Sequence, residues 1–168
     1  MFEHYIKTND ARGLKKSLEE GGFTQEDLNE GLILSTSECE VDVVKTFLEF
    51  GANINATHEL YLPPLHHAID HLNKKVAHFL IDMDADINQK SFGLWTPLHH
   101  AINSECDYAN QIDTEAPELD LITTLLNNGA KVDSQDCDGK TALDLAKEYQ
   151  HLEVIQLLEK QLRTSGST

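Results

Sequence analysis

The feature that most constrains this chain is a pair of short motifs that return at the same spacing. The first has the form GANIN and occurs three times, at 51–55, 84–88 and 129–133. The second, PLHHA or ALDLA, keeps the same register and occurs at 64–68, 97–101 and 142–146. In both cases the copies are 33 and then 45 residues apart. These spacings indicate structural repeats of 33 residues, one of which holds a 12-residue insertion.

Each repeat is expected to contain two helices followed by a hairpin. Pro97 suits a first helical turn, and Thr96 can cap it. A second helix is indicated by the apolar stripe at 121–126, and Gly129 is typical of its end. Asp138–Gly139 is a tight-turn dipeptide. Neither helix can bury its stripe alone, so neighbouring repeats must stack.

The segment Thr96–Ala101 (TPLHHA) matches a signature of one repeat family, and the chain resembles the ankyrin repeats. The resemblance implies an all-α fold, an ankyrin-repeat solenoid of about five helix-turn-helix/β-hairpin units. A single domain is expected over 1–163, with a flexible tail at 164–168. Its units are expected at 1–29, 30–62, 63–95, 96–140 (with the insertion at 105–116) and 141–163. The first and last units are expected to be caps.

Composition argues against several classes of partner. Lys and Arg total 13 while Asp and Glu total 29, which gives a formal net charge of -16. Phosphate binding needs clustered Lys and Arg, so neither nucleic acid nor an anionic membrane is the expected partner. The three cysteines, Cys39, Cys106 and Cys137, have no disulfide or CxxC spacing, which favours a reducing compartment. With no signal peptide or spanning segment visible, we expect a cytoplasmic protein.

The resemblance also implies where a partner binds. In ankyrin repeats the hairpin tips and the exposed face of each first helix form the binding surface. Carried over position by position, with the insertion added, this predicts partner contacts at Glu38, Glu59, Leu60, Leu62, Asp70, His71, Phe92, Trp95, Asn103, Asp107, Asp113, Glu115, Asp138 and Tyr149.

Trp95 is the strongest of these candidates because it is the only tryptophan and is expected on a hairpin tip beside Phe92 and Leu94. Tryptophan at such a place is typical of a binding anchor. The alternative is that Phe92 or Leu94 folds back onto the adjacent hairpin.

The insertion is expected to form a long acidic loop. Six acids and no Lys or Arg occur between Ser91 and Ala130. Long loops in compact domains are usually functional or disordered. One hypothesis is an acidic arm that pairs with basic residues of a partner. The other is a solvated insertion that the fold tolerates.

Chemical sites are indicated only weakly. The pairs His66–His67 and His99–His100 fall at equivalent positions and suggest a metal site, but repeat histidines usually have structural roles. Asp136–Gly139 has part of a calcium-loop pattern, yet Leu145 stands where the last acidic ligand belongs, so a hairpin turn is favoured. Cys106 lacks the orienting group that a thiol nucleophile needs. No metal, cofactor or enzymatic activity is therefore predicted.

The sequence favours a non-catalytic scaffold that binds a basic protein and is monomeric when free. Its charge and small size, with the resemblance, suggest an inhibitor, such as a bacterial immunity protein that neutralises a basic toxin. Two alternatives stay open: an adaptor or bacterial effector that targets a host protein, and a metal-binding or enzymatic role for the histidines.

Overall fold

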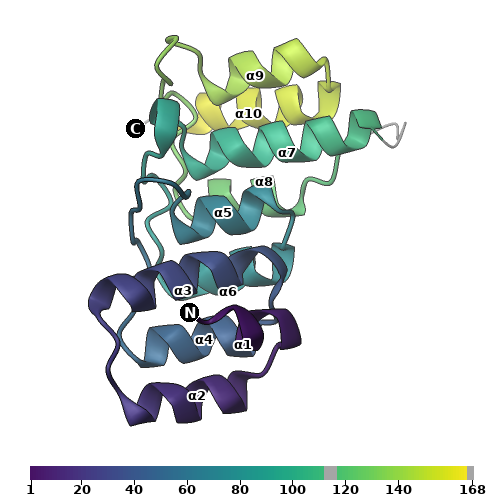
Figure 1. Cartoon of the computed structure of the whole chain (residues 1–168). Helices are drawn as coiled ribbons and strands as arrows, with labels where there is room; N and C mark the ends of the chain where they lie inside the picture. Colours follow the sequence, from purple (N-terminus) through teal and green to yellow (C-terminus); the bar gives the residue numbers. More distant parts are fainter. Residues whose placement is uncertain (112–116, 166–168) are drawn as a thin grey trace. The chain divides into compact units, whose positions relative to one another are not determined.

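The structure, a computed structural model, describes residues 1–111 and 117–165 (Figure 1). The chain divides into two compact units, Met1–Ala85 and Asp86–Thr168, here called unit 1 and unit 2. Each unit is built from helix pairs joined by loops.

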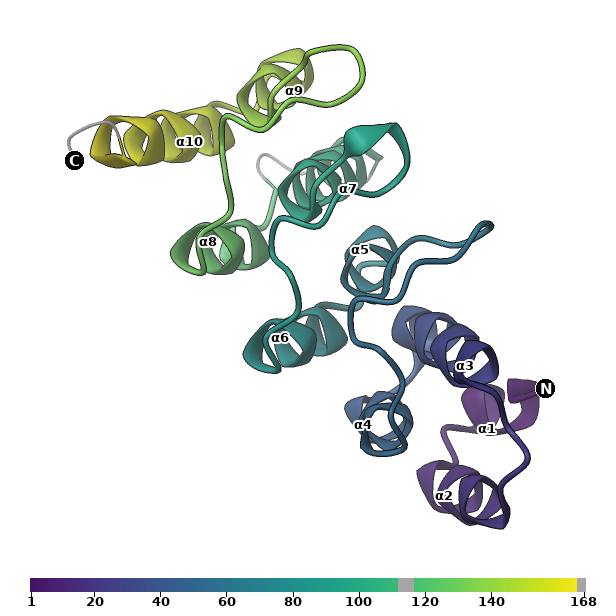
Figure 2. The same ribbon diagram turned by 90° about the vertical axis from the view of Figure 1, so that its left-hand side faces the viewer.

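Unit 1 contains six helices. They are α1 (Glu3–Thr8), α2 (Ala11–Glu20), α3 (Gln25–Glu38), α4 (Val41–Glu49), α5 (Pro64–Asp70) and α6 (Lys74–Asp82). Figure 2 shows α1, α3 and α5 in one row and α2, α4 and α6 in a second row. Helix packing between and along these rows buries the apolar stripes that the sequence repeats.

Local signals explain where the helices of unit 1 begin. The Thr24 hydroxyl accepts the backbone N–H of Asp27 at 3.1 Å, and the Asp27 carboxylate accepts the Thr24 N–H at 2.8 Å, which forms a capping box on α3. Asn73 caps α6, and its amide also donates to the carbonyls of Thr36 and Cys39. This second pair of bonds joins the start of α6 to the preceding repeat.

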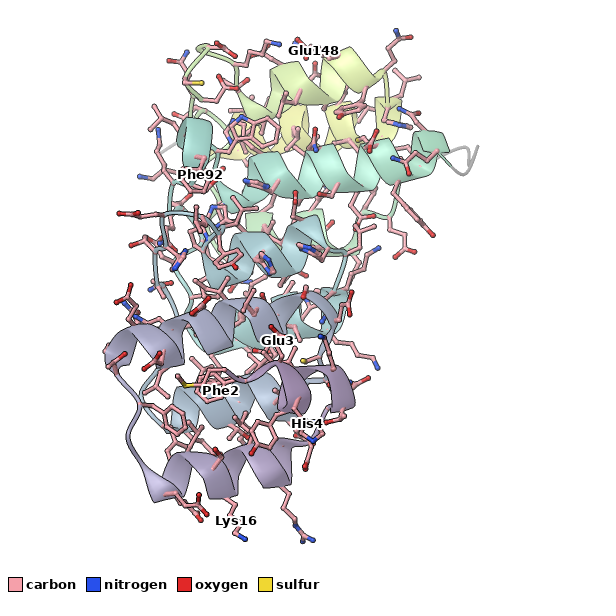
Figure 3. All side chains as sticks on the ribbon, viewed as in Figure 1. Phe2, Glu3, His4, Lys16, Phe92 and Glu148 are labelled. Carbon is pink, nitrogen blue, oxygen red and sulfur yellow. The ribbon has the colours of Figure 1, made fainter. Side chains whose placement is uncertain are left out.

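An aromatic cluster fills the core of unit 1 near the N-terminus. Phe47 is 0% exposed, and its ring meets the edge of Phe2 with centroids 5.0 Å apart. Phe2 also contacts Phe23 at 5.0 Å, and Figure 3 shows it lying over α4. Gly31 of α3 gives these rings room, since a Cβ there would lie 2.4 Å from Phe47 Cε1. The cluster is therefore packed to contact around a glycine.

The described residues of unit 2 form the short 3₁₀ turn η1 (Phe92–Leu94) and four α-helices. These are α7 (Pro97–Gln111), α8 (Asp120–Asn127), α9 (Ala142–Tyr149) and α10 (Leu152–Ser165). Helix α7 packs on α8 and α9, and α9 packs on α10. A single antiparallel bridge, Gln135–Thr141, is the β-structure in the residues that the structure describes. Thr141 and Asp144 form the capping box that begins α9.

The all-α class is confirmed, and the expected helix starts at Thr96–Pro97 and Thr141 match α7 and α9. The single domain over 1–163 and its division into five repeats stay a prediction. Helix α3 runs across the expected boundary between residues 29 and 30. Helix α10 continues through 164–165, where the flexible tail was expected, and residues 166–168 lie outside the described ones.

The expected loop at the insertion is wrong for residues 105–111. These residues continue α7, and Glu105, Cys106 and Ala109 are buried. Ile102, Cys106 and Ala109 follow one another at helical spacing, so the apolar face of α7 simply extends. Residues 112–116 of the insertion lie outside the described residues.

Among the described residues, the helices are all too short or too polar to cross a bilayer.

Candidate functional site

The hairpin before α7 exposes two large apolar side chains. The Ser91 N–H donates to the Trp95 carbonyl at 2.8 Å and closes a tight turn around η1. Gly93 and Leu94 both have positive φ, 69° and 61°. A leucine in this region is strained. Phe92 and Leu94 are 57% and 47% exposed, and Figure 3 labels Phe92 at this turn. The turn, residues 91–95, is called the apolar tip below.

The apolar tip is held against the next hairpin of unit 2. The backbone N–H of Cys137 donates to the Gly93 carbonyl at 2.8 Å. The Asp136 carboxylate accepts the N–H groups of Asp138 and Lys140, each at 2.9 Å, and also accepts a side-chain hydrogen bond from Trp95. Burial acts to raise the pKa of Asp136, but these three hydrogen bonds outweigh it and hold the pKa below its ordinary value. Asp136 therefore stays ionised and fixes the indole.

The calcium-loop pattern at Asp136–Gly139 is thus a hairpin turn, as the sequence favours. The Asp136 side chain bonds its own backbone two and four residues on, which is typical of an Asx turn. Among the described residues, no group of three or more His, Cys, Asp or Glu is arranged to hold a metal ion.

Trp95 lies at the edge of a hollow in unit 2 of about 370 Å³. Side chains from the two hairpins and from α7 and α9 line it, among them Trp95, Asn103, Asp138, Lys140, Glu148 and Tyr149. Figure 3 labels Glu148 on α9. This space is called the Trp95 hollow below.

Two polar contacts shape the walls of the Trp95 hollow. The Tyr149 hydroxyl donates to Asn103 Oδ1 at 2.7 Å and ties α9 to α7. Lys140 Nζ lies 2.7 Å from Glu148 Oε1. Burial raises the pKa of Tyr149, and the charges of Asp107 and Glu148 raise it further. The hollow combines an aromatic wall, an amide and carboxylates, groups that can bind a partner side chain.

Four of the predicted contacts meet at this hollow: Trp95, Asn103, Asp138 and Tyr149. Phe92 lies on the adjoining tip. Asp107 is exposed on α7, where it accepts a hydrogen bond from Gln111 at 2.7 Å. Asp113 and Glu115 lie outside the described residues.

The remaining predicted contacts belong to unit 1. Glu59 and Leu60 are exposed, Leu60 to 78%, and Leu62 is half-buried. Asp70 is exposed at the end of α5.

Glu38 and His71 line a separate hollow of about 380 Å³ in unit 1. Lys74 and Lys75 also line it and equal its carboxylates, Glu38 and Glu40, in number, whereas the carboxylates lining the Trp95 hollow outnumber Lys140. It fits the expected acidic surface less well than the Trp95 hollow does.

Asp136, Lys140 and Glu148 were not among the predicted contacts. Asp136 carried a readable signal, because Asp two residues before an Asp–Gly turn commonly bonds the turn backbone. The repeat register places Lys140 on the hairpin tip before Thr141 and Glu148 on the following first helix, but it does not predict their pairing, which depends on how the hairpin lies against α9.

His67 and His71 of unit 1 are held by polar contacts inside the fold. The Thr36 hydroxyl donates to the Ile33 carbonyl at 2.7 Å, so the same oxygen accepts the Nδ1–H of His67 at 3.0 Å. The His71 Nδ1–H donates to the His67 carbonyl, and the two rings lie with centroids 4.3 Å apart, tilted by 35°. Burial and, to a smaller extent, the nearby His71 lower the pKa of His67 to about 4, against the opposing charge of Asp70.

His99 and His100 are held in the same way in unit 2. The N–H and hydroxyl of Thr96 both approach His99 Nδ1, so Nε2 carries the hydrogen and donates to the Lys140 carbonyl at 3.4 Å. His100 Nε2 lies 3.0 Å from Ser91 Oγ, which itself donates to the Trp95 carbonyl. Both imidazoles therefore brace the hairpin that carries Trp95.

The cysteines are all free thiols. Burial raises the pKa of Cys39 to about 11 and that of Cys106 to about 12. A thiol with such a pKa stays protonated near neutral pH and is a poor nucleophile. Cys137 is exposed beside the apolar tip.

Comparisons with known proteins agree with the architecture. A family model described as ankyrin repeats (three copies) matches residues 32–112, and a single ankyrin-repeat model matches 94–137. An ankyrin repeat protein of Rickettsia bellii (strain RML369-C) is 31% identical over 160 residues, which cover 92% of this chain and 82% of the relative. One of fowlpox virus (strain NVSL) is 26% identical over 137 residues, 70% of this chain and 97% of the relative.

Proposed function

This chain belongs to the ankyrin repeat family, whose repeats are protein–protein interaction modules, and from that premise we propose a non-catalytic scaffold that binds a basic protein through unit 2. The observation that carries the proposal is the apolar tip beside the Trp95 hollow. There an aromatic ring fixed by Asp136 adjoins two exposed apolar side chains and two carboxylates.

A fixed aromatic ring favours affinity because little freedom is lost when a partner binds. The indole of Trp95 is restrained by Asp136 and lies 5.2 Å from the His100 ring. The hydrogen-bonded turn likewise restrains the exposed tip before contact. Preorganised anchors of this kind reduce the entropic cost of association.

Replacing both aromatic anchors is expected to weaken partner binding by about tenfold or more. The variant is Trp95→Ala with Phe92→Ala, and the ligand is the protein that wild type captures and mass spectrometry identifies. The affinity is measured by surface plasmon resonance.

The matched control replaces two exposed apolar side chains elsewhere, Met83→Ala with Leu152→Ala, and should change affinity less than twofold or so. Circular dichroism verifies that both variants keep their helices. Equal affinities for the two double variants would exclude the apolar tip as the contact.

Charge supports a basic partner. The net charge of -16 gives long-range attraction toward Lys- and Arg-rich surfaces. We expect the association rate constant to fall by about tenfold or more between roughly 20 and 300 mM NaCl, while the dissociation rate changes less. Stopped-flow measurement of the Trp95 emission gives both rates. An association rate constant that does not change with NaCl concentration would contradict the proposal of a basic partner.

The finer proposal is that this partner is a basic toxin and that the chain is its inhibitor. Carboxylates around the Trp95 hollow and the excess of acids support it. This proposal requires that cells that produce the toxin regain growth when they also produce this chain. It also requires that the two genes be adjacent. A captured host protein would instead favour the adaptor or effector role.

The exposed and half-buried positions that the sequence predicts in unit 1 and α7 are proposed as further contacts. They are Glu38, Glu59, Leu60, Leu62, Asp70, His71 and Asp107. Three free cysteines fit a reducing, cytoplasmic compartment, and we propose a monomer in the absence of partner.

A further inference from the structure

We infer that the Trp95 hollow accepts the guanidinium of one arginine side chain from the partner, in contact with the indole of Trp95 and the carboxylates of Asp138 and Glu148, which all line it. This inference rests on the proposed function and names the group that the hollow recognises. Its support comes from the ring, the charges, the amide and the volume, in that order.

The indole of Trp95 lines the hollow, and its polar edge is already paired inside the protein. Its side-chain N–H is already used by Asp136. The indole is half-buried and lines the hollow. A planar guanidinium stacks on an aromatic face, where the negative potential of the ring attracts the cation.

The charges around the hollow favour a cation. Lys140 is already there and pairs with Glu148 Oε1, which leaves Glu148 Oε2 and the Asp138 carboxylate as acceptors. The hydrogen bond and charge of Glu148 raise the pKa of Lys140, and the charges of Asp138 and Asp136 act in the same direction. The site thus stabilises the charged form of Lys140. Its lining carboxylates outnumber this lysine, so they can also attract a cation from a partner.

Asn103 places a side-chain amide on the wall of the hollow. Asn103 Oδ1 accepts from Tyr149, so the amide N–H₂ of Asn103 remains a donor on the wall of the hollow. A peptide carbonyl beside the arginine is the natural acceptor for it. The hollow therefore offers complementary groups to both ends of an arginine residue.

The volume and the donor geometry distinguish arginine from lysine. About 370 Å³ lies near the lower end of small-ligand pockets and fits one long side chain. A guanidinium presents five donors in a plane and is weakly hydrated, so it can stack and bond two carboxylates together. A lysine ammonium is strongly hydrated and cannot stack in this way.

The test titrates the full chain with N-acetyl-arginine methylamide at constant ionic strength. Trp95 is the only tryptophan, so its emission and its single indole N–H resonance report the hollow alone. We expect a saturable shift with a dissociation constant on the order of 1 mM. The lysine analogue should bind at least about threefold more weakly, and the neutral citrulline analogue should not saturate.

Variants then locate the site. Asp138→Asn with Glu148→Gln should remove saturation, whereas Lys140→Met should tighten binding because the internal competitor is lost. Asp133→Asn, an exposed acid outside the hollow, is the matched control and should leave binding unchanged.

Each outcome decides the inference. Equal shifts with the arginine and citrulline analogues, or an equal loss in the Asp133 control, would overturn it. If the arginine analogue fails while Trp95→Ala still weakens partner binding, the arginine inference falls and the proposed function stands. If the arginine analogue binds but Trp95→Ala leaves the partner affinity unchanged, the hollow is an arginine site and the proposed function falls.

Discussion

Phe47→Ala is expected to lower the free energy of unfolding by about 3–5 kcal/mol. Phe47 is fully buried on α4, meets the edge of Phe2 and fills the space left by Gly31. Truncation leaves a cavity between α3 and α4 that these neighbours cannot close, because both helices also pack on other helices of unit 1. Urea unfolding followed by circular dichroism at 222 nm measures the loss.

The matched control is Phe92→Ala, which removes the same atoms from a side chain that is 57% exposed. It should change the free energy of unfolding by no more than about 0.5 kcal/mol. Similar midpoints for the two variants would contradict the account of the aromatic cluster.

Acidification is expected to destabilise the fold through His67. The folded pKa of about 4 lies below the ordinary value of 6.5, so as pH falls the unfolded chain takes up the proton first. The stability that depends on neutral His67 is complete above pH 6.5 and is lost as pH falls toward 4. The shift of about 2.5 pH units corresponds to about 3 kcal/mol.

The measurement is the urea midpoint between pH 7.5 and 4.5 for wild type and for His67→Gln. Glutamine keeps a side-chain N–H that can donate to Thr36 but does not titrate, so the variant should lose most of the acid sensitivity. Burial also lowers the pKa of His99, so some sensitivity remains. His4→Gln, at an exposed position, is the control and should behave as wild type.

Much of the fold was predictable because the constant spacing of the recurring motifs shows which residues of one repeat correspond to those of the next. The Thr–Pro and Thr–Ala starts of α7 and α9, and the end of α8 near Gly129, follow from motif spacing and capping. The extension of α7 was missed because acids dominate the insertion and suggested a solvated loop. Cys106 and Ala109, one and two turns after Ile102, were the signal that it stays helical.

The candidate site was predictable only in part. The repeat register placed Trp95 on a hairpin tip and Asn103 and Tyr149 on first helices, and all three line the hollow. What the register does not contain is side-chain pairing. Asp136 lies 41 residues after Trp95, and their bond depends on how far one hairpin overhangs the next. Spacing fixes which loops are neighbours and leaves their separation open.

The exposure of Cys137 makes unit 2 convenient to label. Cys39 and Cys106 are buried thiols of raised pKa, so a maleimide dye should conjugate at Cys137 alone. The backbone N–H of Cys137 is hydrogen-bonded to the carbonyl of Gly93 in the apolar tip. A dye attached there would lie close enough to contact a bound partner. Its fluorescence would then report binding, and no cysteine would have to be introduced or removed.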